Sequence, residues 1–163
     1  DPNEEKKENI VKKEVDVNAI IHAAIDDTML QGKEKDILTT LDIPTNITVW
    51  GDSSLIYGIF RNLIDNSIAY AVGATTIDIS CIKRDNHYEF VISDNGCGVP
   101  KEHLPHIFER FYRVDKGRTR KLGGTGLGLA IVKNAVILHH GNITAYATPG
   151  GGLSVKFTLP SIS

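Results

Sequence analysis

The sequence contains little of what several protein classes depend on. Only two of its 163 residues are cysteines, Cys81 and Cys97, and one lies in a strand-like run while the other lies in a glycine turn. This pattern excludes a disulfide-rich scaffold and offers no spaced pair of metal ligands. No apolar run approaches the ~18 residues that a membrane-spanning helix needs. Acidic and basic residues nearly balance at a net charge of -2, so charge gives no reason to expect nucleic acid or an anionic membrane as a partner.

The residues that are present indicate one globular domain. Hydrophobic residues make up 41% of the chain and charged residues 23%, which is sufficient for a single core. Residues 1–14 are charged and nearly free of apolar side chains. We therefore expect a solvated lead-in or the end of a preceding helical domain there, and one domain over residues 15–163.

Apolar periodicity and turn residues predict three long helices with short strands between them. Helices are expected from Val17 to Gly32, from a cap at Asp52 or Ser53, and from the glycine run to Gly141, with a short aromatic helical turn over 108–113. Strands are expected over 37–41, 47–50, 76–83, 88–93, 142–147 and 153–159, the last four as two hairpins. This order predicts an α+β fold, a two-layer α/β sandwich in which three helices cover one face of a mixed, mainly antiparallel sheet.

The same periodicity predicts which side chains fill the core. The second helix carries a broad apolar stripe of Leu55, Ile56, Ile59, Phe60, Leu63, Ile64 and Ile68. In the third helix we expect a buried face of Leu127, Ile131, Ala135 and Leu138. Trp50 is also expected to pack in the core.

A glycine-rich run opens the third predicted helix. Within six positions it contains Gly123, Gly124, Gly126 and Gly128. Glycine allows close approach of the backbone, and the free N–H groups at a helix start attract phosphate. The spacing matches neither G-x-G-x-x-G nor a Walker A motif. Five cations precede the run, and they form either a solvated charged segment or a set of partners for a polyphosphate: Arg113, Lys116, Arg118, Arg120 and Lys121.

Two further polar groups are candidates for ligand binding. Asn62, Asn66 and Tyr70 recur one turn apart beside the apolar stripe, and an amide oxygen is a ligand that Mg²⁺ accepts alongside phosphate oxygens. The alternative for the asparagines is an ordinary polar surface. Asp94 ends a strand and precedes Gly96 and Gly98, so it could accept a hydrogen bond from a purine amino group. The alternative there is a simple Asp-Asn-Gly turn.

The histidines offer weaker signals. His103 and His106 stand three apart with Pro105 between them and no third ligand near, so we expect no metal there. His139 and His140 stand at the end of the third helix, where we expect them to cap it as cations.

Taken together and in order, four segments resemble the N, G1, F and G2 boxes of sensor histidine kinases. They are residues 62–66, 94–98, 108–111 and 124–129. The resemblance covers roughly residues 15–160 and implies the catalytic, ATP-binding domain of a two-component system, with the Bergerat α/β sandwich. ATP and Mg²⁺ are the cofactors that it implies.

The resemblance also implies a role for each matched residue. Asn66 would hold Mg²⁺ and Asn62 would support the phosphates, while Asp65 is a secondary candidate for polarising the acceptor. Asp94 would bind the adenine amino group. Further nucleotide contacts would come from Tyr70, Gly96, Gly98, Tyr112, Arg113, Gly124, Thr125, Gly126, Leu127, Gly128 and Leu129, with a lid over ATP at about 103–126.

The residue at Asn62 separates this branch from its hydrolysing relatives. Those ATPases carry at this position a glutamate that activates water, whereas an amide cannot act as a base. A histidine acceptor scarcely needs a base, because imidazole with a pKa near ~6.5 is mostly neutral at pH 7. Positioning and charge neutralisation can then supply most of the catalysis of phosphoryl transfer.

Two departures from the family pattern matter. Many members have a lysine that contacts phosphate where this chain has Ala69, and the lid cations would have to replace it. In addition, none of the six histidines lies in a phosphoacceptor motif, since His22 is followed by Ala23-Ala24-Ile25 and lacks the acidic neighbour and the downstream proline. We therefore expect the chain to bind ATP without phosphorylating itself.

The expected partners are a histidine-bearing dimerisation domain of the same protein and then a response regulator, with neither nucleic acid nor direct membrane contact. The domain is expected in the cytoplasm, within a protein anchored in the inner membrane. Two alternatives remain at this stage. One is a nucleotide-binding module that regulates a partner without transfer, and the other is a water-directed ATPase, which Asn62 disfavours.

Overall fold

The computed structural model describes residues 10, 12–114 and 128–162. In chain order its elements are β1 (Lys13–Asp16), α2 (Val17–Glu34), β2 (Leu38–Asp42), β3 (Thr48–Gly51), α3 (Ser53–Tyr70), β4 (Thr76–Lys83), β5 (His87–Asp94), the 3₁₀ helix η1 (Lys101–His106), α5 (Gly128–Leu138), β6 (Ile143–Ala147) and β7 (Leu153–Pro160). The first strand takes in Lys13 and Glu14, two residues of the expected lead-in.

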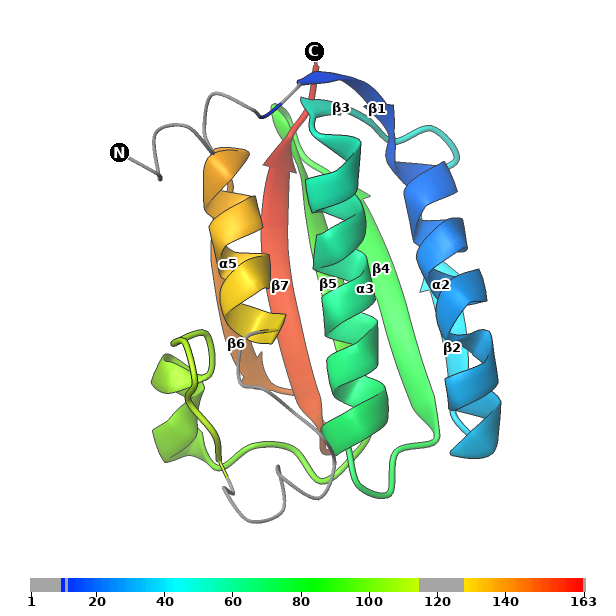
Figure 1. Cartoon of the computed structure of the whole chain (residues 1–163), viewed down its shortest axis with the longest axis vertical. Helices are drawn as coiled ribbons and strands as arrows, with labels where there is room; N and C mark the ends of the chain where they lie inside the picture. The colour runs from blue at the N-terminus through cyan, green and yellow to red at the C-terminus, as the bar shows by residue number, and fades with distance from the viewer. Residues whose placement is uncertain (1–9, 11, 115–127, 163) are drawn as a thin grey trace.

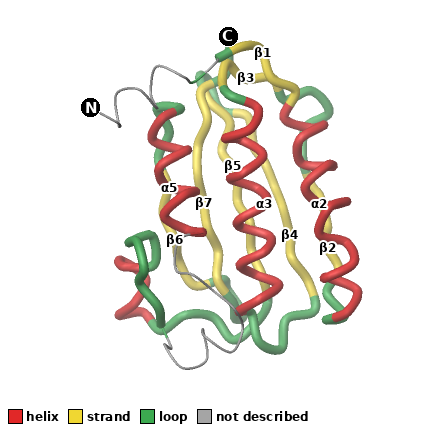
Figure 2. The backbone as a smooth tube through the Cα atoms, in the orientation of Figure 1, coloured by secondary structure: helices red, strands yellow, loops and turns green. Residues whose placement is uncertain are grey.

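Helices and strands form two layers, as predicted. The main sheet has the order β2-β4-β5-β7-β6, in which β2 and β4 run parallel and the other neighbours antiparallel. Helices α2, α3 and α5 lie side by side on one face of this sheet (Figure 1). The tube view shows the same separation, with β1 and β3 as a small pair at one end (Figure 2). The predicted mixed sheet with three helices on one face is confirmed.

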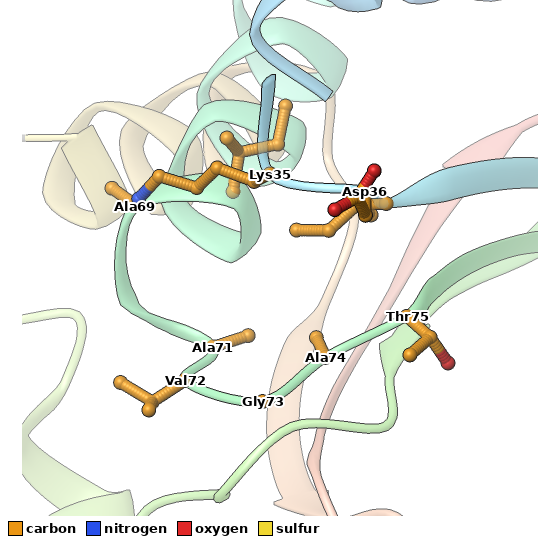
Figure 3. Close-up of a pocket in the computed structure, with 10 residues that line it drawn as sticks. Lys35, Asp36, Ala69, Ala71, Val72, Gly73, Ala74 and Thr75 are labelled. Carbon is orange, nitrogen blue, oxygen red and sulfur yellow. The ribbon is translucent and has the colours of Figure 1, made fainter. Parts of the chain in front are cut away.

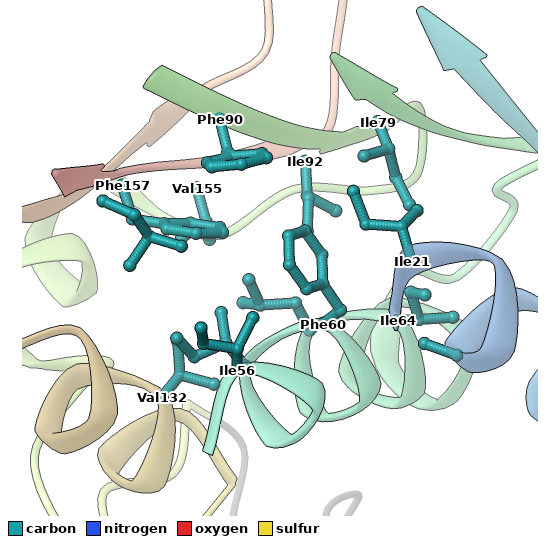
Figure 4. Packing of buried hydrophobic residues seen from close by; sticks show 14 of the residues in the cluster. Ile21, Ile56, Phe60, Ile64, Ile79, Phe90, Ile92, Val132, Val155 and Phe157 are labelled. Atoms are coloured by element: carbon teal, nitrogen blue, oxygen red, sulfur yellow. The ribbon is translucent and has the colours of Figure 1, made fainter. Parts of the chain in front are cut away.

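The core joins α3 to the centre of the sheet. The ring of Phe60 lies 5.4 Å from that of Phe90 on β5 and 5.5 Å from that of Phe157 on β7, both edge to face. The two sheet rings stack at 5.0 Å. All three side chains are fully buried, and isoleucines of α2, α3 and β4 surround them (Figure 4). Burying each such ring contributes roughly 2–3 kcal/mol, so the predicted apolar stripe of α3 fixes how this helix lies on the sheet.

Three predictions about the periphery are wrong. Trp50 is 59% exposed, because strand alternation directs its neighbours Val49 and Gly51 inward and places Trp50 on the outer face of the β1–β3 pair. Ile131 is 48% exposed, and the buried face of α5 is Val132, Ala135 and Val136. That helix is apolar nearly all round, so periodicity could not choose its face.

The third wrong prediction concerns the short helical turn that was expected between β5 and the glycine run. The helical turn there is η1, which ends at His106, and not the predicted 108–113. Pro100 stands at its N-cap, where a restricted φ suits the entry to a helix. Phe111, within the expected turn, has φ 66° and so leaves the right-handed helical region.

The start of α3 is held from two directions. The Asp52 carboxylate accepts from the backbone N–H of Leu55 at 3.1 Å, which confirms the predicted cap. The backbone N–H of Asp52 donates to Nε2 of His139 at 3.0 Å, while Nδ1 of that ring bonds the Ala135 carbonyl at 2.7 Å. The expectation of a cationic cap at His139 is wrong, because this ring is buried and accepts a hydrogen bond at Nε2.

We expect stability to depend on the neutral form of His139. Burial lowers the pKa of this imidazole, against the opposing effect of the Ala135 carbonyl. Since the unfolded chain then binds more protons, the free energy of unfolding should fall as pH decreases below about 6.5. Urea titrations between about pH 7.5 and 5 would measure how the free energy of unfolding changes with pH.

The matched variants for this test are His139→Asn and His22→Asn, the latter on the exposed side of α2. His139→Asn should flatten the pH dependence at a lower overall stability, and His22→Asn should retain it. An unchanged slope in His139→Asn would contradict the assignment.

Candidate functional site

The polar row of α3 lies beside the helix's buried stripe. Asn62, Asn66 and Tyr70 are all half-buried. The Asn62 amide nitrogen donates to the Gly58 carbonyl at 2.8 Å, which fixes its rotamer. Its oxygen would lie 3.3 Å from a Cβ built on Gly128, the first residue of α5. The fold therefore brings the asparagine row next to the end of the glycine run.

The second part of the site is a buried carboxylate at the end of β5. Asp94, at the end of β5, is 4% exposed and is the only buried acidic side chain in the described part of the chain. Its Oδ1 accepts from the backbone N–H groups of Gly96 at 3.0 Å and Leu153 at 3.2 Å. Its Oδ2 accepts from the Ser67 hydroxyl at 3.3 Å. These donors orient the carboxylate and leave acceptor capacity for a further N–H group.

Two glycines allow the backbone to close around Asp94. A Cβ on Gly96 would lie 2.8 Å from Ala71, just after α3, so only glycine lets the two segments meet. Gly152 has φ +113°, and its Cβ would lie 1.9 Å from the Asp94 carbonyl oxygen. Close approach here brings the N–H of Leu153 to the carboxylate.

Sequence reasoning missed Ser67, Gly152 and Leu153. A signal existed for Ser67, because it is a polar residue inside the apolar stripe of α3. The glycine triplet 150–152 was interpreted only as a hairpin turn, and nothing in the sequence indicates that the hairpin end contacts Asp94 across 59 residues.

Asp65 lies in a different environment from the asparagine row. Its Oδ2 pairs with Nε of Arg61 at 3.0 Å, and Arg61 also donates to the Tyr57 hydroxyl at 3.1 Å. The Tyr57 hydroxyl in turn donates to Asp27 on α2. The hydrogen bond that Arg61 donates to Tyr57 contributes most to raising the pKa of Arg61. The structure therefore places Asp65 in a polar chain that runs toward α2.

The residues of the expected lid are only partly described. Tyr112 and Arg113 are half-buried, and the Tyr112 hydroxyl bonds Nδ1 of His103 while its ring stacks on His106 at 5.3 Å. Gly128 and Leu129 begin α5. Gly124, Thr125, Gly126 and Leu127 lie outside the described residues. Within the described ranges, no three His, Cys, Asp or Glu side chains form a group that could hold a metal.

The site thus combines the asparagine row of α3, the start of α5 at Gly128 and the buried carboxylate of Asp94. Residues 51–162 match the family described as histidine kinase-, DNA gyrase B- and HSP90-like ATPases. The chain belongs to this family. As an ATP-binding domain of the histidine kinase type, it carries an amide at Asn62 and a single buried acidic side chain, Asp94, in the described part of the chain.

Sequence relatives narrow the family to sensor histidine kinases. The chain is 40% identical over 146 residues to the sensor-like histidine kinase SenX3 of Mycolicibacterium smegmatis, covering 90% of this chain and 38% of the relative. It is 41% identical over 118 residues to the histidine-protein kinase BaeS of Escherichia coli, covering 72% of this chain and 25% of the relative. The chain thus spans well under half the length of these curated relatives and corresponds to their catalytic, ATP-binding domain.

Solved structures agree with the sequence relatives. The mycobacterial sensor histidine kinase MprB superposes with a TM-score of 0.77 at 29% identity, covering 93% of this chain and 98% of the other. The ATP-binding domain of PrrB from Mycobacterium tuberculosis superposes with a TM-score of 0.75 at 26% identity, with the same coverage. No helix in the described ranges of the chain has the length and apolar character needed to cross a bilayer.

Proposed function

We propose that this domain binds ATP with Mg²⁺ and transfers the γ-phosphate to a histidine on a separate, dimeric helical domain of the same protein, from which a response regulator then receives it. The observation that carries the proposal is the buried carboxylate of Asp94, which is oriented by the backbone N–H groups of Gly96 and Leu153 and by Ser67 of α3, the helix that also carries Asn62 and Asn66.

In this proposal different residues bind the base, the phosphates and the metal ion of the nucleotide. Asp94 accepts a hydrogen bond from the adenine amino group, and the backbone at Gly96 and Gly98 lies flat against the base. Tyr70 packs beside the base. Asn62 supports the phosphates and Asn66 contributes an amide oxygen to Mg²⁺, which neutralises phosphate charge when bound. Arg113 and residues 124–129 approach the terminal phosphates.

The transfer step needs no base from this chain. The lone pair of a neutral imidazole nitrogen forms the new N–P bond while the bond from the γ-phosphorus to the bridging oxygen breaks, and ADP leaves with that electron pair. Asn62 holds the phosphates without activating water, because an amide cannot accept the proton of a nucleophile. The proposed location is the cytoplasmic side of a protein anchored in the inner membrane, where ATP is supplied.

The experiment that tests the proposal combines this chain with a separate helical domain bearing the acceptor histidine. With γ-labelled ATP and Mg²⁺ we expect an acid-labile, base-stable label on the helical domain and none on this chain. ATP binding without transfer would indicate a regulatory module instead, and rapid release of phosphate would indicate a water-directed ATPase.

Asn66→Asp should abolish use of MgATP in the same assay. The change adds a negative charge beside the phosphates and replaces a neutral metal ligand, so we expect at least about a tenfold loss of transfer. The matched control is Asn142→Asp, an exposed position after α5, which should transfer normally. Wild-type transfer by Asn66→Asp would remove Asn66 from the site.

A further inference from the structure

A cavity of about 340 Å³ lies where α2 and α3 end, on the outer side of the loop that leads into β4 (Figure 3). Its walls are the segment between α2 and β2 on one side and the last turn of α3 with the following loop on the other. It is lined by Lys35, Asp36, Ile37, Ile68, Ala69, Ala71, Val72, Gly73, Ala74 and Thr75. Lys35 is the only cation among these residues.

The side chain of Lys35 extends across this cavity toward α3. Lys35 is the C-cap residue of α2 and lines the cavity together with Ala69, and its side chain points toward the last turn of α3, away from the Asp36 carboxylate (Figure 3). None of the ion pairs between described residues involves Lys35. The Lys35 ammonium group therefore extends toward α3 without forming an ion pair with any acidic side chain among those residues.

Position 69 adjoins the asparagine row. Ala69 follows Asn66 by three residues, which places the two on neighbouring turns of one helical surface, and it precedes Tyr70. The methyl group of alanine cannot donate a hydrogen bond to an anion, but its small size leaves space for a side chain that extends from the end of α2. The Lys35 side chain thus points toward the turn of α3 that follows Asn66.

The loop that forms one wall of the cavity is tied to the loop at Asp94. The Asn95 amide oxygen accepts from the backbone N–H groups of Thr75 at 2.8 Å and Thr76 at 3.0 Å, and its nitrogen donates to the Thr75 hydroxyl at 2.8 Å. Ala71 packs against Gly96 from the same side. The cavity and the base pocket therefore share one wall, which keeps Lys35 at a fixed place relative to the nucleotide.

From these contacts we propose that Lys35 binds the phosphate groups of the nucleotide, supplying from α2 the positive charge that α3 lacks at Ala69. This inference rests on the proposed function, because it takes the phosphates to lie along Asn62 and Asn66. A lysine ammonium acts as a mobile point charge with three donors, and its four-carbon stem allows the short movement from Ala69 to a phosphate oxygen.

The test measures equilibrium binding of ATP and of adenosine to the 163-residue chain by calorimetry. Lys35→Gln keeps most of the stem and removes the charge, and it should weaken ATP binding by about three- to tenfold while leaving adenosine unchanged. Lys33→Gln, on the exposed last turn of the same helix, is the matched control and should bind both ligands as the wild type does. Adding Ala69→Lys to Lys35→Gln should restore ATP affinity.

Two results would overturn the inference: wild-type ATP affinity in Lys35→Gln, or an equal loss for ATP and adenosine, which would indicate a structural role at the end of α2. Failure of Ala69→Lys to restore ATP affinity, with adenosine binding intact, would reject the placement beside position 69. Absence of transfer to an acceptor histidine, with ATP affinity still dependent on Lys35, would reject the proposed kinase function alone.

Discussion

Replacing Asp94 by asparagine is expected to weaken ATP binding by roughly 30- to 150-fold, corresponding to about 2–3 kcal/mol. The carboxylate is held by Ser67, Gly96 and Leu153, so an asparagine must direct its one oxygen to the two backbone donors. Its amide nitrogen then faces the adenine amino group, and two donors oppose each other across a buried contact. Calorimetric titration of ATP and adenosine would measure the loss, which should be equal for both ligands.

The matched control for this prediction is Asp85→Asn. Asp85 is exposed in the turn between β4 and β5, where asparagine fits as well as aspartate. It carries the same change in charge, so it corrects for the altered net charge of the protein. ATP affinity in Asp94→Asn that equals that of Asp85→Asn would show that Asp94 does not contact the base.

Gly152→Ala is expected to lower the free energy of unfolding by about 2–5 kcal/mol and to remove most ATP binding. At φ +113° any Cβ is strained, and here it would lie 1.9 Å from the Asp94 carbonyl oxygen and 2.9 Å from Oδ1. The β7 strand has to move away from β5, which withdraws the N–H of Leu153 from the carboxylate. Urea unfolding together with ATP titration would measure both effects.

The variant Gly150→Ala distinguishes the effect of a steric contact, as at Gly152, from the effect of backbone strain alone. Gly150 also has positive φ, +89°, but a Cβ there meets nothing within 4 Å. We expect a cost of about 1 kcal/mol from strain alone and normal ATP affinity. If the two alanine variants were equally stable, the steric contact between Gly152 and Asp94 would have no energetic weight.

Local patterns were sufficient for the three long helices and the strands of the main sheet, but not for β1 or η1, and they singled out the candidate site residues. The stripe of α3 runs from Ile56 to Ile68 with an unambiguous period, and its cap at Asp52 follows from a side chain that bonds a nearby N–H. Asp94 was predictable as a candidate because a carboxylate at a strand end before two glycines is a local feature. Each of these depends on residues within a few positions of one another, which is the range over which sequence pattern and backbone geometry are coupled.

Contacts between distant segments were not predictable in the same way. Trp50 has a strong apolar character, yet it alternates along β3 with Val49 and Gly51, which point into the molecule, so its own side chain is left exposed. His139 was expected as a cation at the end of α5, and it is instead buried as an acceptor for the first residue before α3, 87 positions away. Burial and the partner of a side chain are properties of the packed molecule.

The sequence alone was enough for the two-layer fold, its three long helices, the family and a set of candidate nucleotide-binding residues, because periodicity and motif spacing depend on neighbouring residues. The tertiary structure was needed to show that Ser67 and the Gly152–Leu153 backbone hold Asp94, that Asp65 pairs with Arg61, and that Lys35 and Ala69 line one cavity. The physical reason is that hydrogen bonds and close approaches act over a few ångströms, and which segments come that close depends on the packing of the whole chain.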